Sequence, residues 1–192
     1  MLIHDATSGQ SVKIDKKNRM ATNSVTTTPI SHISEYDGDA FFTYAKHTIQ
    51  ANATDEPVLF MEVGQSDKHV KVSHVVFSTN ADLVKFEIHL AVTLNSYGTS
   101  EVPPKILNRS KNKASSLSSY DNRNNDLSVT VGTGSNEAEL ADIRLSTGQQ
   151  TYTLDFKDSL LLQSTNNFYV LAEGDAGDKV RCSVYFYETS IE

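Results

Sequence analysis

The feature that most constrains the fold is a strict alternation of apolar and polar side chains over residues 84–94. Successive side chains of a β-strand point to opposite faces of its sheet, so a period of two predicts a half-buried strand. Burial of one large apolar side chain stabilises a fold by about 1.5–3 kcal/mol, so we expect this strand to contribute strongly to the core. Its apolar row is Val84, Phe86, Ile88, Leu90, Val92 and Leu94, with Lys85, Glu87, His89 and Thr93 opposite.

Further segments rich in β-branched and aromatic residues predict additional strands, separated by Gly, Asn and Asp turn residues. Residues 58–63 are apolar on both faces except for Glu62, which is typical of a central strand. The other segments are residues 70–79, 106–108, 127–131, 152–156, 168–172 and 180–186. About eight strands at this spacing predict an all-β protein, an antiparallel β-sandwich of jelly-roll or Greek-key type.

Two segments carry a weaker helical pattern. Residues 135–142 could form two helical turns, capped by Ser135 or Asn136. Residues 37–49 could form a short helix or an irregular lead-in to the first core strand. We therefore expect a docking arm over residues 1–30, a lead-in segment over residues 31–55 and the β-sandwich domain over residues 56–192.

The first thirty residues are polar, rich in Thr and Ser, and poor in apolar residues. Such a segment buries too little apolar surface to offset its own ordering entropy. It contains one hairpin pattern: a short strand over residues 12–15, a turn over residues 15–18, and a return strand from Arg19. We expect this segment to become ordered against a partner, as an extended arm.

The opening residues also resemble those of a family of tailed-bacteriophage virion structural proteins. Those proteins begin with an Asp-Gly-rich segment, then a hydrophobic-Asp-x-x-Asn-Arg-hydrophobic run, then Ser-Val-Thr. Here the run is Ile14-Asp-Lys-Lys-Asn-Arg-Met20, followed by Ser-Val-Thr at residues 24–26, and Ala6 departs from the family's first Gly. The docking residues that we predict on this basis are Asp5, Val12, Ile14, Asp15, Asn18, Arg19 and Met20.

This resemblance implies a non-enzymatic virion component, such as a head decoration, head fibre, or collar or tail accessory subunit. Its partners would be other virion proteins (the major capsid, portal, collar or tail proteins) and copies of itself, which we expect to form a trimer. It would assemble in the bacterial host cytoplasm and reside in the virion. No cofactor is expected.

Charge and composition agree with this class. The chain of 192 residues has a formal net charge of −7, which argues against nonspecific binding to nucleic acid. No apolar run approaches the roughly 18 residues that a membrane-spanning helix needs. Cys182 is the single cysteine, so no disulfide within the chain is possible, and its place on an apolar row predicts a small core side chain.

Motifs for catalysis are missing or isolated. Residues 110–113 match Ser-x-x-Lys, but they lie in a polar segment without a companion motif. His69 and His74 are five residues apart in one predicted strand, so they face opposite sides and cannot share a metal without a bulge. These observations predict that the protein is not an enzyme.

Two acidic clusters around glycines are weak candidates for a Ca²⁺ site, because hard oxygen ligands on a Gly-containing loop suit this ion. Asp-Gly pairs are also common in turns, and solvated turns are the favoured interpretation. The clusters are Glu35, Asp37 and Asp39, and Glu173, Asp175 and Asp178.

Residues 108–126 read as a long polar loop, which is uncommon inside a compact domain. Its basic side chains, on an otherwise acidic chain, could contact an acidic neighbouring subunit, or the loop could be a mobile surface excursion. The contact candidates are Lys111, Lys113, Tyr120 and Arg123.

A second surface and a second function complete the predictions. Tyr185, Tyr187 and Ile191 lie opposite the apolar row of residues 180–186, so they are candidates for an intersubunit surface. The alternative function is a β-sandwich module of a phage receptor-binding apparatus that binds a host-surface glycan. The chain has no Trp, so its aromatic candidates for sugar contact are Tyr97, Tyr120, Tyr185 and Tyr187.

Overall fold

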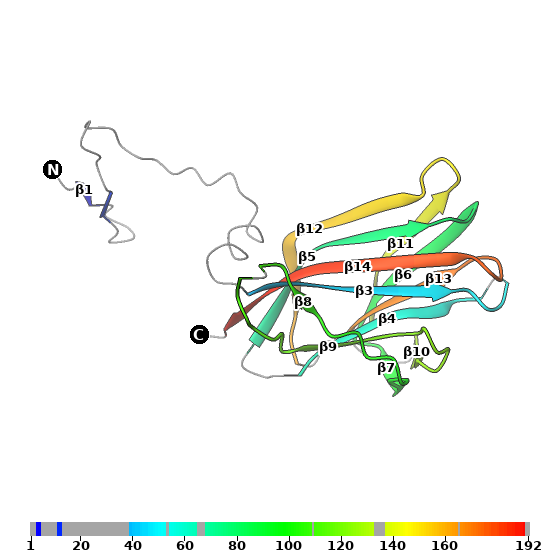
Figure 1. The fold of residues 1–192 in the computed structure, drawn as a ribbon, viewed down its shortest axis with the longest axis horizontal. Helices are drawn as coiled ribbons and strands as arrows, with labels where there is room; N and C mark the ends of the chain where they lie inside the picture. Colours follow the sequence, from blue (N-terminus) through cyan, green and yellow to red (C-terminus); the bar gives the residue numbers. More distant parts are fainter. Residues whose placement is uncertain are drawn as a thin grey trace.

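The described part of the chain is all-β, with two five-stranded antiparallel sheets packed face to face as a β-sandwich (Figure 1). The computed structural model describes residues 3–4, 11–12, 39–52, 54–64, 68–108, 110–132, 137–164 and 166–190. The predicted fold class is confirmed at the level of an antiparallel sandwich. No helix in these residues is long and apolar enough to cross a membrane.

The first sheet has the strand order β11-β6-β13-β4-β9. Its members are β4 (Glu56–Val63), β6 (Leu83–Leu90), β9 (Leu117–Asp121), β11 (Ala138–Ser146) and β13 (Phe168–Glu173). β4 pairs with β13 on one side and β9 on the other, as the apolar character of residues 58–63 predicted for an interior strand.

The second sheet has the strand order β12-β5-β14-β3-β8. Its members are β3 (Ala40–Thr48), β5 (Lys68–Thr79), β8 (Lys105–Ile106), β12 (Thr151–Leu162) and β14 (Lys179–Ser190). β14 is central, and β3 runs antiparallel beside it, with Ala40 opposite Tyr187 at one end and Thr48 opposite Lys179 at the other.

The core fills the space between the sheets. Phe77 of β5 and Phe86 of β6 are both fully buried and meet across this space, with ring centroids 4.8 Å apart. Cys182 is buried in the same cluster, and this burial raises the pKa of its thiol, so it is the core side chain that the apolar pattern predicted.

The alternation of residues 84–94 belongs to two strands, not to one. β6 ends at Leu90, and Ala91 takes a left-handed conformation with φ 54°. The chain continues as β7 (Thr93–Ser96), which pairs with β10 (Ser128–Thr130) in a separate two-stranded sheet. Around this small sheet, Val92 and Leu127 pack with Phe60 and Tyr169, on the first sheet's outer side.

Both helical predictions are wrong where the structure describes them. Residues 40–48 form β3, so the lead-in segment is already part of the sandwich, which begins at Ala40 and not at residue 56. Its inward row combines Phe41 and Ala45 with the polar Thr43 and His47, which hides the period of two. Residues 138–146 form β11, an edge strand of mostly exposed side chains.

In the first thirty residues, the structure describes β1 (Ile3–His4) paired with β2 (Ser11–Val12). Val12 therefore lies opposite Ile3, and the predicted turn and return strand from Arg19 lie outside the described residues. The other predicted docking residues, Asp5, Ile14, Asp15, Asn18, Arg19 and Met20, lie outside the described residues.

Candidate functional site

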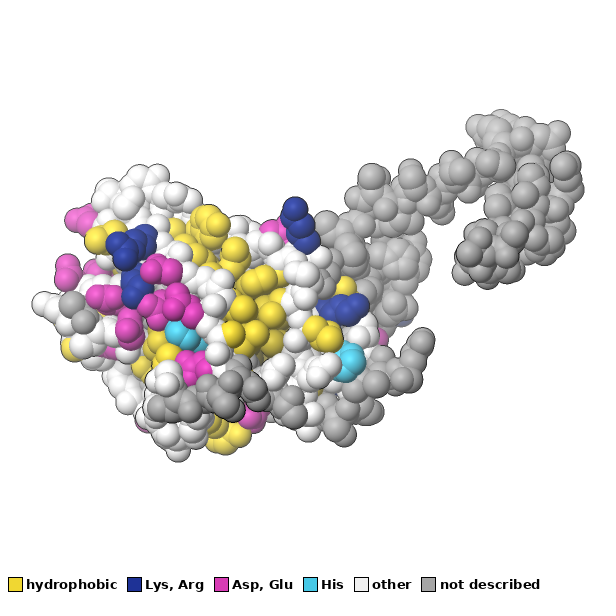
Figure 2. Space-filling view, turned by 180° about the vertical axis from the view of Figure 1, so that it is seen from behind, with side chains coloured by type: hydrophobic (Ala, Val, Ile, Leu, Met, Phe, Trp, Pro, Cys, Tyr) yellow, Lys and Arg dark blue, Asp and Glu magenta, His cyan; other side chains and the backbone are white. Residues whose placement is uncertain are grey.

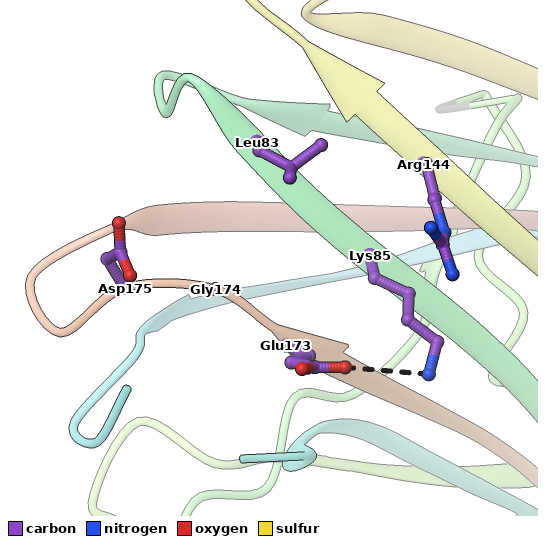
Figure 3. Close-up of a pocket in the computed structure, with 6 residues that line it drawn as sticks. All are labelled: Leu83, Lys85, Arg144, Glu173, Gly174 and Asp175. Atoms are coloured by element: carbon purple, nitrogen blue, oxygen red, sulfur yellow. Dashed lines mark hydrogen bonds and ion pairs between the residues drawn. The ribbon is translucent and has the colours of Figure 1, made fainter. Parts of the chain in front are cut away.

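A charged groove lies on the outer face of the first sheet, beside the turn after β13 (Figure 3). Because Val84 and Phe86 point into the core, the alternating residues Leu83 and Lys85 of β6 point outward. The groove has a volume of about 290 Å³ and is lined by Leu83, Lys85, Arg144, Glu173, Gly174 and Asp175. Leu83 is 62% exposed, an unusual place for a large apolar side chain.

Gly174 allows the turn to approach the end of the core. A Cβ at this position would come within 2.9 Å of Ile49 Cδ1 and 3.0 Å of Asp178 Oδ2. A larger residue would push the turn away from the sandwich, so glycine is favoured here for close packing.

Lys85 is the centre of the groove's electrostatics. Its Nζ forms an ion pair with Glu87 and lies 3.5 Å from Glu173 Oε2, as Figure 3 shows for the second contact. The hydrogen bond with Glu87 is the main cause of a raised pKa for Lys85. Burial alone would raise the pKa of Glu87, but hydrogen bonds with Lys85 and His89 outweigh it and lower that pKa. Both groups therefore stay charged near neutral pH and act as an ion pair, not as a proton donor and acceptor.

The charges around the groove form a wider patch on this face. His89 is 5% exposed and lies between two carboxylates, with Nε2 2.9 Å from Glu87 Oε2 and Nδ1 3.5 Å from Glu137 Oε1. Figure 2 shows acidic side chains gathered around lysine, arginine and histidine on this side of the molecule. The groove is lined mainly by charged side chains of both signs, so it suits recognition of a charged partner.

Two tyrosines that the sequence offered for sugar contact meet on this sheet. The rings of Tyr97 and Tyr120 are 4.7 Å apart, and Phe60 lies 5.9 Å from Tyr97. Tyr97 is 40% exposed and its hydroxyl donates to Glu62 Oε2 at 3.0 Å, which raises the pKa of Tyr97 to about 12. Sequence spacing did not predict this pair, because the two tyrosines meet only through strand pairing. β9 lies beside β4 and brings Tyr120 near Glu62, which is the hydrogen-bond partner of Tyr97.

The predicted intersubunit tyrosines lie on the second sheet. Tyr185 is half-buried and stacks on His74 at 4.4 Å and on Phe42 at 5.9 Å. Tyr187 is 4% exposed and packs with Ala40 inside the chain, so its prediction as an accessible interface residue is wrong. Ile191 lies outside the described residues.

The polar segment 108–126 is not one long loop, because it contains β9. Lys113 forms an ion pair with Asp39, and Arg123 Nη2 donates to Asp121 Oδ2 at 2.9 Å. Tyr120 is half-buried, and Lys111 is exposed. Of the four contact candidates, Lys111, Lys113 and Arg123 are therefore exposed, and Lys113 and Arg123 are each paired with a carboxylate of the same chain.

The acidic metal candidates are not brought together in the described part of the chain. Asp39 pairs with Lys113, Glu173 pairs with Lys85, and Asp178 Oδ2 accepts a hydrogen bond from the Asp175 amide at 2.9 Å. Glu35 and Asp37 lie outside the described residues. Among described residues, no group of three His, Cys, Asp or Glu side chains is arranged to hold a metal ion.

The prediction that His69 and His74 face opposite sides is wrong, because a bulge at Ser73 of β5 leaves both outside the buried row of Val70, Val72 and Val75. The two histidines nevertheless make separate contacts. His69 Nε2 lies 3.4 Å from Gln163 Nε2, whereas His74 stacks on Tyr185.

No family model, no curated protein and no solved structure matches this chain. Its function must therefore be inferred from its own residues and geometry.

Proposed function

We propose that this protein is a non-enzymatic structural component of a tailed-bacteriophage virion, assembled in the host cytoplasm. It would be a head decoration or head fibre, or a collar or tail accessory subunit. Residues 1–30 would dock on a neighbouring virion protein, and the sandwich would project outward. The similarity of the opening residues to the virion family supports this proposal, and so does the all-β body.

One observation carries the proposal. Every described strand of the two five-stranded sheets lies between Ala40 and Ser190, so among the described residues neither sheet takes a strand from the first 39 residues. β3 starts at the same end of the second sheet where β14 finishes. From that end, β3 extends over roughly 26 Å, at about 3.3 Å per residue. This arrangement suits a body that is attached at one end and presents the opposite end to solvent.

Electron cryomicroscopy of the intact particle tests where the protein lies in the virion, and it also tests the trimer that we expect.

A complementation assay tests whether residues 1–30 act as the docking arm. Particles made with a chain that lacks residues 1–30 should contain no copies of the protein. Arg19→Ala should lower occupancy, because the planar guanidinium suits a carboxylate on the neighbour. Lys17→Ala, a nearby change of the same charge, should have a smaller effect. Normal occupancy of the truncated chain would refute docking through the arm.

Tyr97 and Tyr120 favour the second candidate function, a module that binds a host-surface glycan. Their adjoining rings, with Tyr97 partly exposed, present an aromatic surface on which a sugar ring can stack. A glycan array probed with the full chain and with Tyr97→Ala tests this function. Binding that the substitution removes, while Tyr152→Ala retains it, would favour the glycan module.

A further inference from the structure

A second cleft, of about 430 Å³, lies at the end of the second sheet opposite the start of β3. It is formed where β3 ends, where β14 begins and where the chain turns after β9. Its charged lining residues are cations: Lys46 from β3, Lys179 and Arg181 from β14, and Arg123 from the turn. All four side chains belong to exposed residues, and no carboxylate lines the cleft.

The pairing of β3 with β14 makes this arrangement costly for the free protein. Lys46 and Arg181 are direct cross-strand partners, and like charges in directly opposed positions destabilise a sheet. Among the described residues, no ion pair with a carboxylate offsets Lys46, Lys179 or Arg181. Arg123 alone of the four has such a partner, the buried Asp121. On a chain with a net charge of −7, this concentration of unpaired positive charge calls for an anion.

Neutral polar groups complete the lining. Gln50, Asn125 and Thr48 place side-chain amides and a hydroxyl around the cations. His47 lies at the inner side, 4% exposed, with Nδ1 3.1 Å from the Asn122 carbonyl oxygen and Nε2 2.6 Å from Glu56 Oε2. Both ring nitrogens of His47 therefore face acceptors, and Glu56 is occupied by this histidine and by two backbone amides. It is not available to neutralise the cleft.

We propose that this cleft binds an oxyanion: a carboxylate, phosphate or sulfate group carried by a small ligand. The planar guanidinium of Arg181 can bind two oxygens of such a group at once. Lys46, across from it on β3, and Lys179, two residues earlier on β14, add point charges. The volume lies within the range of small-ligand sites. An inorganic oxyanion and the acidic group of a sugar offer the same chemistry, so the ligands to be tested are phosphate, sulfate and glucuronate.

The test uses the full chain in isothermal titration calorimetry and in thermal unfolding, at constant ionic strength set with NaCl. The neutral sugar glucose is the control for glucuronate. Saturating phosphate, sulfate or glucuronate should raise the melting temperature by at least about 2 °C, because a ligand of the folded state shifts the unfolding equilibrium. Tighter binding of glucuronate would identify an acidic sugar as the source, and tighter binding of phosphate or sulfate an inorganic ion.

Two variants separate binding from folding. Arg181→Gln and Lys46→Gln each remove one member of the opposed pair, so without added anion each should melt at or above the temperature of the unchanged chain. Both should weaken anion binding by about tenfold or more, whereas Lys111→Gln, at an exposed lysine outside the cleft, should leave it unchanged. The proposal is overturned if no tested anion binds at millimolar concentration, or if Arg181→Gln binds it as tightly as Lys111→Gln does.

Discussion

At the scale of single residues, the inward-facing polar side chains of β3 and β9 have hydrogen-bond partners. Ser119 Oγ lies 2.9 Å from Thr43 Oγ1 and donates to the Val102 carbonyl oxygen at 2.5 Å. Asp121, fully buried, accepts from Ser100 Oγ at 2.5 Å and from Arg123. A buried polar group without such a bond would cost about 1–3 kcal/mol. These residues therefore join β3, β9 and the segment before β8 by hydrogen bonds in place of apolar contact.

Glu56 provides a pH-dependent test of this network. Its Oε2 contacts His47, and its Oε1 accepts from the Gln50 and Ala51 amides, both at 2.8 Å. Burial acts to raise the pKa of Glu56, but these bonds outweigh it and lower that pKa from its ordinary value of 4.5. The carboxylate therefore adds stability above its unfolded-state pKa, and this contribution is lost as pH falls through the lower folded-state pKa.

We expect Glu56→Gln to reduce the free energy of unfolding by about 1–3 kcal/mol at pH 7. The difference from the unchanged chain should shrink as pH falls below 4.5. Urea denaturation at a series of pH values measures both effects. Glu139→Gln, on the exposed edge strand, should change stability by less than about 0.5 kcal/mol. A difference that stays constant down to pH 3 would mean that the ionised carboxylate is not what stabilises this corner.

Sequence patterns predicted the apolar core residues well and the inward polar residues poorly. Cys182 and Phe86 follow from alternation alone, because their neighbours in the same row are also apolar. His47 and Asp121 have no such signal, since burial of these side chains depends on partners far along the chain. The cationic cleft was missed for the same reason: only strand pairing places Lys46 opposite Arg181.

At the scale of elements, Ala91 decides where β6 ends and β7 begins. Its φ of 54° is unfavourable for a residue with a Cβ, by roughly 1–2 kcal/mol. The break is held by Asn167, whose backbone oxygen accepts from the Ala91 amide at 3.1 Å. The Asn167 side chain exchanges two hydrogen bonds of 2.8 Å with Val92. Because of this break between the strands, Val92 and Leu94 cover the outer side of the first sheet and do not enter the core between the two sheets.

Ala91→Gly should therefore stabilise the protein by up to about 1 kcal/mol, since relief of the left-handed strain exceeds the entropy that glycine adds to the unfolded chain. Chemical denaturation measures the change. The same substitution in ordinary strand geometry, Ala138→Gly, should destabilise by about 0.5–1 kcal/mol. Equal destabilisation by both substitutions would show that Ala91 is not strained in solution.

Elements were predictable where one face is apolar and the other polar. The long segments within β6 and β14 meet this condition, and both lie in the interior of their sheets. β9 and β11 are edge strands, the first with polar inward residues and the second mostly exposed, so hydrophobic period carried little information about them. β3 is paired on both sides, but its inward row alternates Phe41 and Ala45 with the polar Thr43 and His47. The apolar residues of this segment, Ala40, Phe41, Tyr44 and Ala45, are spaced like one face of a helix, so the period of two was hidden.

At the scale of the whole molecule, the two sheets present different surfaces. The outer face of the first sheet carries the groove around Lys85, with Glu87 and Glu173 beside it. The second sheet carries the stacked Tyr185 and, at its far end, the cleft with Lys46, Lys179 and Arg181. The net charge of −7 does not reveal this separation, because charge counts carry no positions. Sequence patterning could predict the sandwich but not how charge is distributed over its faces.

The independence of the sandwich from the first residues gives the last prediction. A chain that lacks residues 1–30 should keep its β-type circular dichroism, and its melting temperature should change by less than about 3 °C. The reason is that the earliest described strand of either main sheet begins at Ala40. A chain that lacks residues 183–192 should not fold, because β14 is paired on both sides and loses Val184 and Phe186 from the core. A larger drop in melting temperature for the first truncation would mean that residues 1–30 pack on the sandwich of the free protein, and docking of the arm would then have to break those contacts.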